Sequence, residues 1–493
     1  MVLEEPADPG GLAQLAREAL ENGSEAEAAP VLQAAAERAG SNAVLWHWAA
    51  LLHRALDRYD EALDAFARAA ALAPEDAPLA QGRAMATLEA GLDAVPLFET
   101  AARLAPQSGE VLLGMAAARF AAGDGARGIA DLEKVLETSP GWVAGHQGLA
   151  RLRSLMGDHA NAHASLDRAI AAYPGDFRLW HALIHLLGQR DRHTDVLDAI
   201  RRGRAAVDGG IFFDANEAVA RSESGDAEGA DAMFARIGEI DEVGFGVRQV
   251  RHMLRNGRVA EALPVVDRWL GVAGMPLMWP YAATAWRMAG DPRWEWLEGD
   301  ERLVSVIDLG DRLPGLGRLA DTLRSLHLAQ GEPIDQSVRG GTQTDGVLFT
   351  RIDPEIRALR AVIVEAVAQH IAQLPPPDPA HPTLGARRDR PVRFSGAWSV
   401  RLGGGGCHVN HTHPMGWFSS ALYVSLPEAR EGDPGWLTLG EPQKELGLDV
   451  APFRKIEPRP GRLVLFPSTM WHGTVPFAEG ERLTVAFDVA PPK

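Results

Sequence analysis

Four prolines recur at an almost constant interval in the first half of the chain, and this interval limits the possible folds more than any other feature. The intervals are 32, 34 and 34 residues, and they separate Pro74, Pro106, Pro140 and Pro174. Eight positions before each proline stands a large apolar residue, namely Phe66, Phe98, Leu132 and Leu166. A second series of turn residues keeps the same period and comprises Gly91, Gly123, Gly157, Gly225 and Gly257. A period of this length predicts a stacked array of short structural repeats.

The residue types explain why each repeat would hold two antiparallel helices. Glycine permits the tight turn between the helices, and proline ends the second helix before the next repeat begins. This pattern resembles the tetratricopeptide repeat, over roughly residues 10–290 and most clearly over 43–174. The resemblance implies an N-terminal all-α superhelix whose groove binds a protein or peptide. The alternative is a scaffold that supports the next domain or joins two copies into a homo-oligomer.

The periodicity is lost after residue 290, and the chain between 291 and 390 is expected to connect the array to a further domain. Residues 294–328 have a helical pattern, whereas 336–346 are polar and glycine-containing, which predicts a loop. An apolar helix is expected over 354–373, because Pro354 suits the first turn of a helix and the apolar residues recur with a period near 3.6. The domains expected are therefore 1–290, 291–390 and 391–493.

The last hundred residues change to short β-like segments separated by glycine, proline and aspartate. These segments are 394–402, 417–426, 436–439, 462–466 and 482–489. Many short strands with turn residues between them predict an all-β jelly roll. The fold class expected is thus a multidomain chain, all-α first and all-β last, with supporting helices.

Histidines cluster in this β-rich region. His408, His411 and His413 fall within six residues, and His472 follows after further strands. His411 and His413 would share one face of a regular strand, and His408 would face the other way. Neutral imidazole is a good ligand for iron, zinc or copper, so the cluster predicts a metal site with open positions for substrates.

Longer stretches around these histidines resemble the iron(II)- and 2-oxoglutarate-dependent oxygenases, and more narrowly the bacterial ones that follow a tetratricopeptide array. The similar stretches are His411-Thr-His413-Pro, Ser419-Ser-Ala-Leu-Tyr423-Val, Pro460-Gly-Arg-Leu-Val-Leu-Phe-Pro467, His472 and Arg482-Leu-Thr-Val-Ala-Phe. The resemblance covers about residues 330–490 and implies a double-stranded β-helix. It also implies Fe(II), with 2-oxoglutarate as cosubstrate and dioxygen as oxidant.

Carried over residue by residue, the resemblance implies that His411, His413 and His472 bind the metal. Arg482 matches the arginine that pairs with the far carboxylate of 2-oxoglutarate, and Tyr423 is a second candidate for cosubstrate binding. The residues expected to surround the ligands are His408, Asn410, Arg339 and Gln343. The adjacent Cys407 is expected to be a small buried residue.

The chain departs from the family at position 413, where the usual second ligand is an aspartate or glutamate. A histidine there leaves the site one negative charge short. Two questions stay open at the level of sequence: whether His413 or His408 is the ligand, and which metal is bound. Family members with only two protein ligands exist, so the missing carboxylate does not by itself imply inactivity.

Three functions fit this sequence. The first is a 2-oxoglutarate-dependent hydroxylase acting on a protein or peptide held by the repeats, similar to the fusion of helical repeats and oxygenase in aspartyl/asparaginyl β-hydroxylases. The second is a cupin-like metal enzyme that does not use 2-oxoglutarate. The third is a repeat adaptor without enzymatic activity. Arg482 favours the first function over the second.

Composition excludes some partners. The net charge of −17 argues against nucleic acid and against an acidic membrane surface as partners. The chain has one cysteine, no long apolar run and no signal-like N-terminus, so we expect a cytoplasmic protein without disulfides.

Overall fold

The computed structural model describes residues 8–272, 276–332, 334, 336–428 and 432–492. The chain forms two compact units. The first holds Met1–Val135 with Asp345–Ala361, and the second holds Leu136–Thr344 with Val362–Pro492. The three-domain division expected from the sequence stays a prediction.

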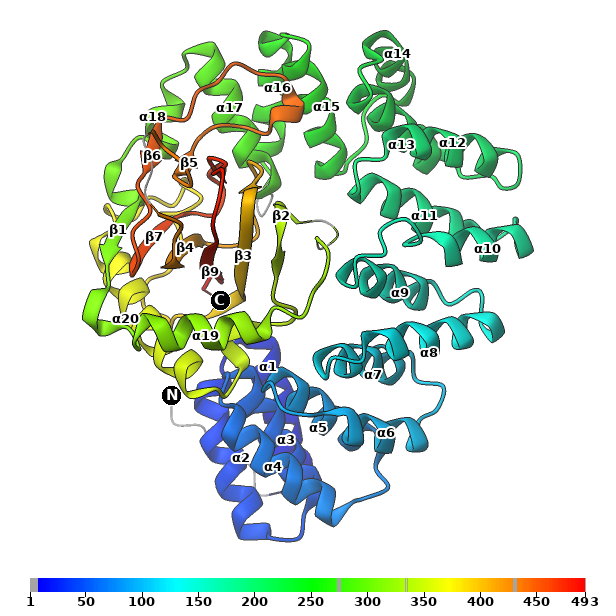
Figure 1. Ribbon diagram of the computed structural model, residues 1–493, viewed down its shortest axis with the longest axis vertical. Helices are drawn as coiled ribbons and strands as arrows, with labels where there is room; N and C mark the ends of the chain where they lie inside the picture. Colours follow the sequence, from blue (N-terminus) through cyan, green and yellow to red (C-terminus); the bar gives the residue numbers. More distant parts are fainter. Residues whose placement is uncertain (1–7, 273–275, 333, 335, 429–431, 493) are drawn as a thin grey trace. The chain divides into compact units, whose positions relative to one another are not determined.

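Helices account for the first three hundred residues (Figure 1). Those up to the unit boundary are α1 Pro9–Asn22, α2 Glu25–Ala39, α3 Ala43–Ala55, α4 Tyr59–Leu72, α5 Ala77–Glu89, α6 Val95–Leu104, α7 Gly109–Ala121 and α8 Gly125–Thr138. The next are α9 Val143–Leu155, α10 Ala164–Ala172, α11 Phe177–Gln189, α12 His193–Arg204, α13 Gly210–Glu223, α14 Ala227–Ile237, α15 Val243–Arg255, α16 Val259–Leu270, α17 Trp279–Ala289 and α18 Arg293–Glu298.

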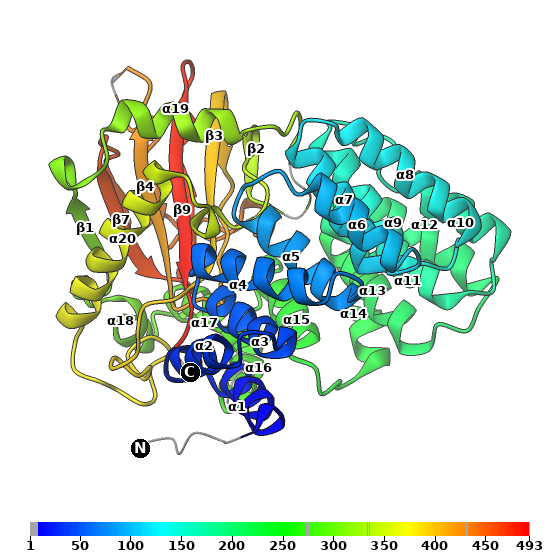
Figure 2. The ribbon, with the colours of Figure 1, turned by 90° about the horizontal axis from the view of Figure 1, so that it is seen from below.

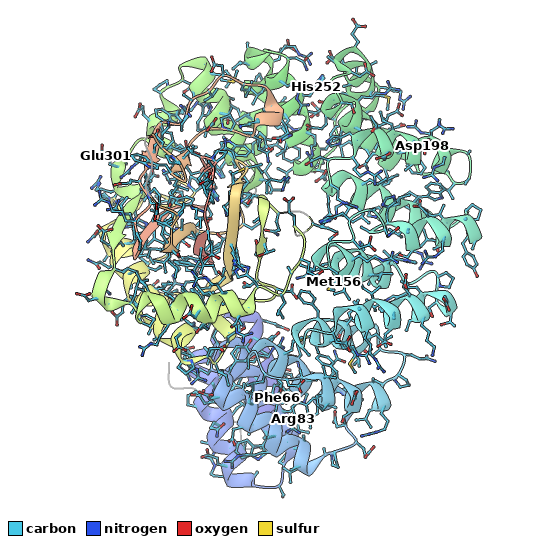
Figure 3. The ribbon with its side chains drawn as sticks, in the orientation of Figure 1. Phe66, Arg83, Met156, Asp198, His252 and Glu301 are labelled. Carbon is cyan, nitrogen blue, oxygen red and sulfur yellow. The ribbon has the colours of Figure 1, made fainter. Side chains whose placement is uncertain are left out.

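In the first unit the periodic apolar residues are buried between helices, and a periodic glycine makes a turn, as their spacing predicts. Phe66 on α4 and Phe98 on α6 are fully buried, and Phe66 lies inside the helical layer in Figure 3. Gly91 has φ +78°, a left-handed conformation that favours glycine, and it makes the turn between α5 and α6. The segment 345–361 joins this unit, because the Thr350 hydroxyl donates to the Glu89 carbonyl and Arg360 pairs with Asp57 at 3.0 Å.

The β-rich part of the second unit consists of two antiparallel sheets. The six-stranded sheet has the order β1-β7-β4-β9-β3-β2, and the three-stranded sheet has the order β6-β5-β8. The strands are β1 Ser305–Asp308, β2 Val338–Gln343, β3 Phe394–His408, β4 Phe418–Ser425, β5 Leu437–Leu439, β6 Arg454–Ile456, β7 Arg462–Pro467, β8 His472–Thr474 and β9 Arg482–Val489.

Helices cover one face of the larger sheet. Figure 2 shows α19 (Leu316–Leu326) and α20 (Pro354–Gln373) beside β4 and β9. The ring of His370 on α20 meets Phe418 on β4 edge to face, with centroids 4.6 Å apart. Successive side chains on β4 point to opposite faces of the sheet, so every second one points away from α20 and toward the smaller sheet. The expected all-α repeat region followed by a jelly roll with supporting helices is confirmed.

The structure corrects two local predictions. The segment 294–328 was expected to be helical throughout, but it contains β1, which pairs with β7 at the edge of the sheet. The polar segment 336–346 was expected to be a loop, but it contains β2, which pairs with β3 across a bulge between Arg339 and Gly341. β1 has only four residues, and β2 is polar and contains two glycines; neighbours distant in sequence stabilise both strands, so a local reading of the sequence does not reveal them. The helix expected over 354–373 is confirmed as α20.

Within the described part of the chain, no helix combines the length and apolarity that a membrane-spanning segment requires.

Candidate metal centre and its pocket

Three of the predicted histidines meet between the two sheets. Each of His411, His413 and His472 offers one ligand nitrogen, and these three atoms lie within 4.8 Å of one another. His472 begins β8, and His411 pairs with it through two backbone hydrogen bonds of 2.9 and 3.0 Å. The His413 amide donates to the Ser468 carbonyl, which anchors the second histidine to the end of β7. The backbone thus holds all three residues in place.

Hydrogen bonds also orient the three rings. Nδ1 of His411 lies 2.8 Å from the Val409 carbonyl, and Nδ1 of His472 lies 3.0 Å from the Met470 carbonyl. Nδ1 of His413 lies 2.6 Å from a carboxylate oxygen of Asp488. Since each acceptor is an oxygen, Nδ1 carries the proton in all three rings, and Nε2 keeps a lone pair. This tautomer is the one that a metal ligand needs.

The environment keeps the imidazoles of His411 and His472 neutral. Burial, and then the charge of neighbouring His472, hold the pKa of His411 well below its usual range. Burial, followed by His413, lowers the pKa of His472 to about 3. Neutral rings are available to a divalent cation at neutral pH, and three of them can occupy one face of an octahedral ion.

His408 lies at the same centre, contrary to the face expected from strand parity. Its ring is stacked on that of His411 with centroids 5.9 Å apart, and the Ser337 hydroxyl lies 2.9 Å from His408 Nδ1 and 3.1 Å from His411 Nε2. Strand β3 ends at His408 and the chain bends before His411, so the alternation of a regular strand does not extend across this segment. Burial, and then Arg482, lower the pKa of His408 to about 3.

Arg482 opens β9 and lines the same pocket as the histidines. Only 2% of its surface is exposed, and among the described residues its Nε has no hydrogen-bond partner. Its guanidinium lies over the ring of Tyr423, 5.1 Å from the centroid. The Tyr423 hydroxyl is also buried without a hydrogen-bond partner among the described residues. A buried guanidinium Nε and a buried hydroxyl that lack hydrogen-bond partners are costly unless a ligand pairs with them.

The other predicted neighbours of the ligands have different surroundings. Gln343 on β2 lines the pocket. Arg339 is not among the lining residues and donates to the carbonyls of Gln336 and Val338. Asn410 is buried and donates its amide to the Pro442 carbonyl, which makes it a support for the turn between His408 and His411. Cys407 is partly exposed and is not a member of the histidine cluster.

Two residues that the sequence did not single out complete the centre. Asp488 on β9 pairs with His413, and its other carboxylate oxygen accepts a hydrogen bond of 2.6 Å from Ser419 on β4. Asp488 and Ser419 are direct partners in the sheet register. The parity of β9 was the available signal, because Arg482, Thr484, Ala486 and Asp488 alternate along one face and all line the pocket.

Helices of the repeat region hold the turn that carries His472. The Trp471 indole donates to the Pro280 carbonyl and to the Thr284 hydroxyl on α17, both at 3.0 Å. Arg287, one turn further along α17, donates to the carbonyls of Gly440 and Ala451 near β5 and β6. Figure 1 shows α17 beside these strands of the smaller sheet.

Comparison with known families matches both parts of the chain. A family model described as "Putative 2OG-Fe(II) oxygenase" matches residues 396–488, where 2OG denotes 2-oxoglutarate. Two tetratricopeptide-repeat models match residues 119–187 and 43–76. No curated protein matches the chain.

Solved structures of both kinds resemble parts of the chain. A Pseudomonas putida prolyl-4-hydroxylase is 20% identical, with 39% of this chain and 94% of that chain covered and a TM-score of 0.27. YrrB, titled a TPR protein with an unusual peptide-binding site, is 20% identical over 36% of this chain and 93% of its own, with a TM-score of 0.29. A tetratricopeptide repeat protein from Parabacteroides merdae is 18% identical over 48% and 94%, with a TM-score of 0.31. These scores are too low to carry an argument about function.

Proposed function

Because this chain combines tetratricopeptide repeats with a C-terminal domain of the 2OG-Fe(II) oxygenase family, we propose that it is an Fe(II)- and 2-oxoglutarate-dependent dioxygenase. In this proposal His411, His413 and His472 hold the iron, and residues 391–493 form the catalytic core. When bound, iron and 2-oxoglutarate together with dioxygen supply the oxidising chemistry. The protein supplies binding, orientation and a shielded site.

The residues present fit this pair of ligands. The three histidines present Nε2, His411 and His472 are kept neutral by burial, and imidazole suits Fe(II). Arg482, at the start of β9, adds a buried positive charge to the same pocket. Its guanidinium can bind a carboxylate through two parallel hydrogen bonds. Tyr423 places a hydroxyl beside that guanidinium.

One observation carries the proposal: a buried arginine with an unpartnered Nε shares a pocket with three metal-competent histidines. A metal enzyme that needs no 2-oxoglutarate has no use for a buried cation at this place, because a buried charge with no anionic partner among the described residues destabilises the fold. A repeat adaptor without enzymatic activity would need neither the buried arginine nor the three histidines.

We further propose that the substrate is a protein or peptide recruited by the repeats, and that it is hydroxylated. The support for this is the attachment of α17, from the repeat region, to the turn that carries His472. A polypeptide held on the neighbouring helices would therefore lie on the same unit as the proposed metal site.

The test is an anaerobic titration of the Fe(II)-loaded protein with 2-oxoglutarate, followed through the visible metal-to-ligand charge-transfer band. The wild type should develop the band. Arg482→Ala should bind 2-oxoglutarate at least ~100-fold more weakly, because removing one partner of a buried charge pair costs about 3–5 kcal/mol. Arg302→Ala is a control, since Arg302 pairs with Asp300 at an exposed position and does not line the pocket.

A wild-type protein that binds Fe(II) but gives no band with 2-oxoglutarate would contradict the proposal and favour a cupin-like enzyme. A wild type that binds no divalent metal at all would favour the adaptor.

A further inference from the structure

A carboxylate lies one hydrogen bond away from the candidate metal ligands, although none is among them. The family pattern has a carboxylate as second ligand, and this chain has His413 there. Asp488 contacts the far side of that ring, with its carboxylate 2.6 Å from Nδ1. Among the described residues that line the pocket, Asp488 is the only acid.

The carboxylate is held in position from its other side. A hydroxyl has one proton, so Ser419 donates to Asp488 and accepts from Ser468, at 2.6 and 3.0 Å. Ser468 also receives the His413 amide on its carbonyl oxygen. Asp488 on β9, Ser419 on β4, Ser468 directly after β7 and His413 therefore form a closed ring of contacts. Side-chain exposures of 13% for Asp488 and 23% for His413 keep this ring largely shielded from water.

A carboxylate behind a metal-bound histidine fixes the tautomer and makes Nε2 a stronger donor. The combined charge of three imidazoles and this carboxylate equals that of two imidazoles and one direct carboxylate. From this geometry we infer that Asp488 is a positioning residue that supplies the negative charge of the metal site through His413. The inference rests on the proposed metal site and deepens it.

The first test measures metal affinity alone, by titrating Co(II) as a redox-stable probe into the full-length apoprotein. Asp488→Asn keeps the size of the side chain and an oxygen acceptor for Nδ1–H, but removes the charge. We expect its affinity for Co(II) to fall about 10- to 100-fold. The matched control is Asp308→Asn, which makes the same change on β1 of the same sheet, outside the pocket, and should leave the affinity unchanged.

A rescue variant separates charge from packing. In Asp488→Asn/His413→Asp the carboxylate moves from behind the ring to the ligand position itself. If Asp488 acts through its charge, this double variant should bind Co(II) more tightly than Asp488→Asn. If Asp488 only packs the sheet, the second substitution should weaken binding further, and that result would overturn the inference.

The charge-transfer band with Fe(II) and 2-oxoglutarate gives a second readout. A less negative ligand set makes Fe(II) harder to oxidise, so the band of Asp488→Asn should move to shorter wavelength. Ser419→Ala removes a donor that withdraws charge from Asp488, so its band should move to longer wavelength. Ser419→Ala also keeps the inference testable if Asp488→Asn does not fold.

The outcomes distinguish this inference from the proposed function. Co(II) affinity that depends on Asp488, without any band in the wild type, would retain the metal site and contradict 2-oxoglutarate use. A normal wild-type band, with Asp488→Asn unchanged in affinity and wavelength, would refute the role of Asp488 alone.

Discussion

The orientation of each imidazole depends on the oxygen that accepts its Nδ1 proton. For His411 and His472 that oxygen belongs to the residue two positions earlier, so a short stretch of chain fixes the ring. For His413 it belongs to Asp488, 75 positions away. Two of the three candidate ligands are therefore oriented by local backbone, and the third depends on the pairing of β4 with β9.

Tyr423 allows a prediction at the same scale. Its buried hydroxyl has no partner among the described residues, and burial raises its pKa although Arg482 acts in the opposite direction. An unsatisfied buried hydroxyl costs about 1–3 kcal/mol. Tyr423→Phe should therefore leave the apoprotein at least as stable as the wild type. If the hydroxyl binds the cosubstrate, the Kd for 2-oxoglutarate should rise about 5- to 100-fold.

The measurements are denaturant unfolding of the apoprotein and titration of the charge-transfer band. Metal affinity serves as the internal control and should not change. An unchanged Kd for 2-oxoglutarate would limit Tyr423 to packing against Arg482.

At the scale of elements, β8 is a three-residue strand whose position is fixed from three sides. It pairs with β5 and with His411. Gly473 faces Asn410 so closely that a Cβ would lie 1.9 Å from the Asn410 side-chain oxygen, which explains the glycine beside the last histidine. On the third side, Trp471 is attached to α17. A strand this short owes its position to these contacts more than to its own sequence.

Trp471→Phe tests the attachment to α17. The substitution keeps an aromatic ring but removes the indole donor; the Pro280 carbonyl still accepts from the Thr284 hydroxyl, so we expect a cost of about 0.5–1.5 kcal/mol. We expect a lower unfolding midpoint and weaker Co(II) binding, because His472 follows directly. Trp296→Phe is the matched control: its indole donates to Asp378 at a partly exposed position, so the loss should be smaller.

The readouts are urea unfolding and Co(II) titration. A variant that loses stability but keeps full metal affinity would show that α17 supports the fold without positioning His472.

On the scale of the whole molecule, buried neutral histidines outside the metal centre make stability depend on pH. Burial lowers the pKa of His370 to about 4, and burial followed by Arg401 lowers that of His327 to about 4. The unfolded chain takes up these protons below pH about 6.5, whereas the folded chain stays neutral to about pH 4. The free energy of unfolding therefore has its full value above pH about 6.5. It decreases as the pH falls toward 4, by about 3 kcal/mol for each histidine.

His370→Asn isolates one contribution. Asparagine cannot titrate, and its amide can replace Nδ1 beside the Ser305 hydroxyl, which lies 2.7 Å from that nitrogen. The variant should lose stability less steeply than the wild type between pH about 6.5 and 4. Urea unfolding followed by tryptophan fluorescence at several pH values measures the slope; equal slopes would contradict the assignment.

The sequence by itself determined the repeat period, the change from helices to strands, the helix over 354–373 and the candidate residues for the metal and cosubstrate. The helix and the change to strands depend on interactions within one element, so a short window of sequence contains them. The period emerged by comparing several repeats, and the site residues by resemblance to an oxygenase family. Only the tertiary structure decided where strands β1 and β2 lie, that His408 faces the same centre as His411, and that Asp488 lies behind His413. Each of these depends on partners tens of residues apart whose pairing is fixed by the folded sheet, and a short window of sequence does not contain that pairing.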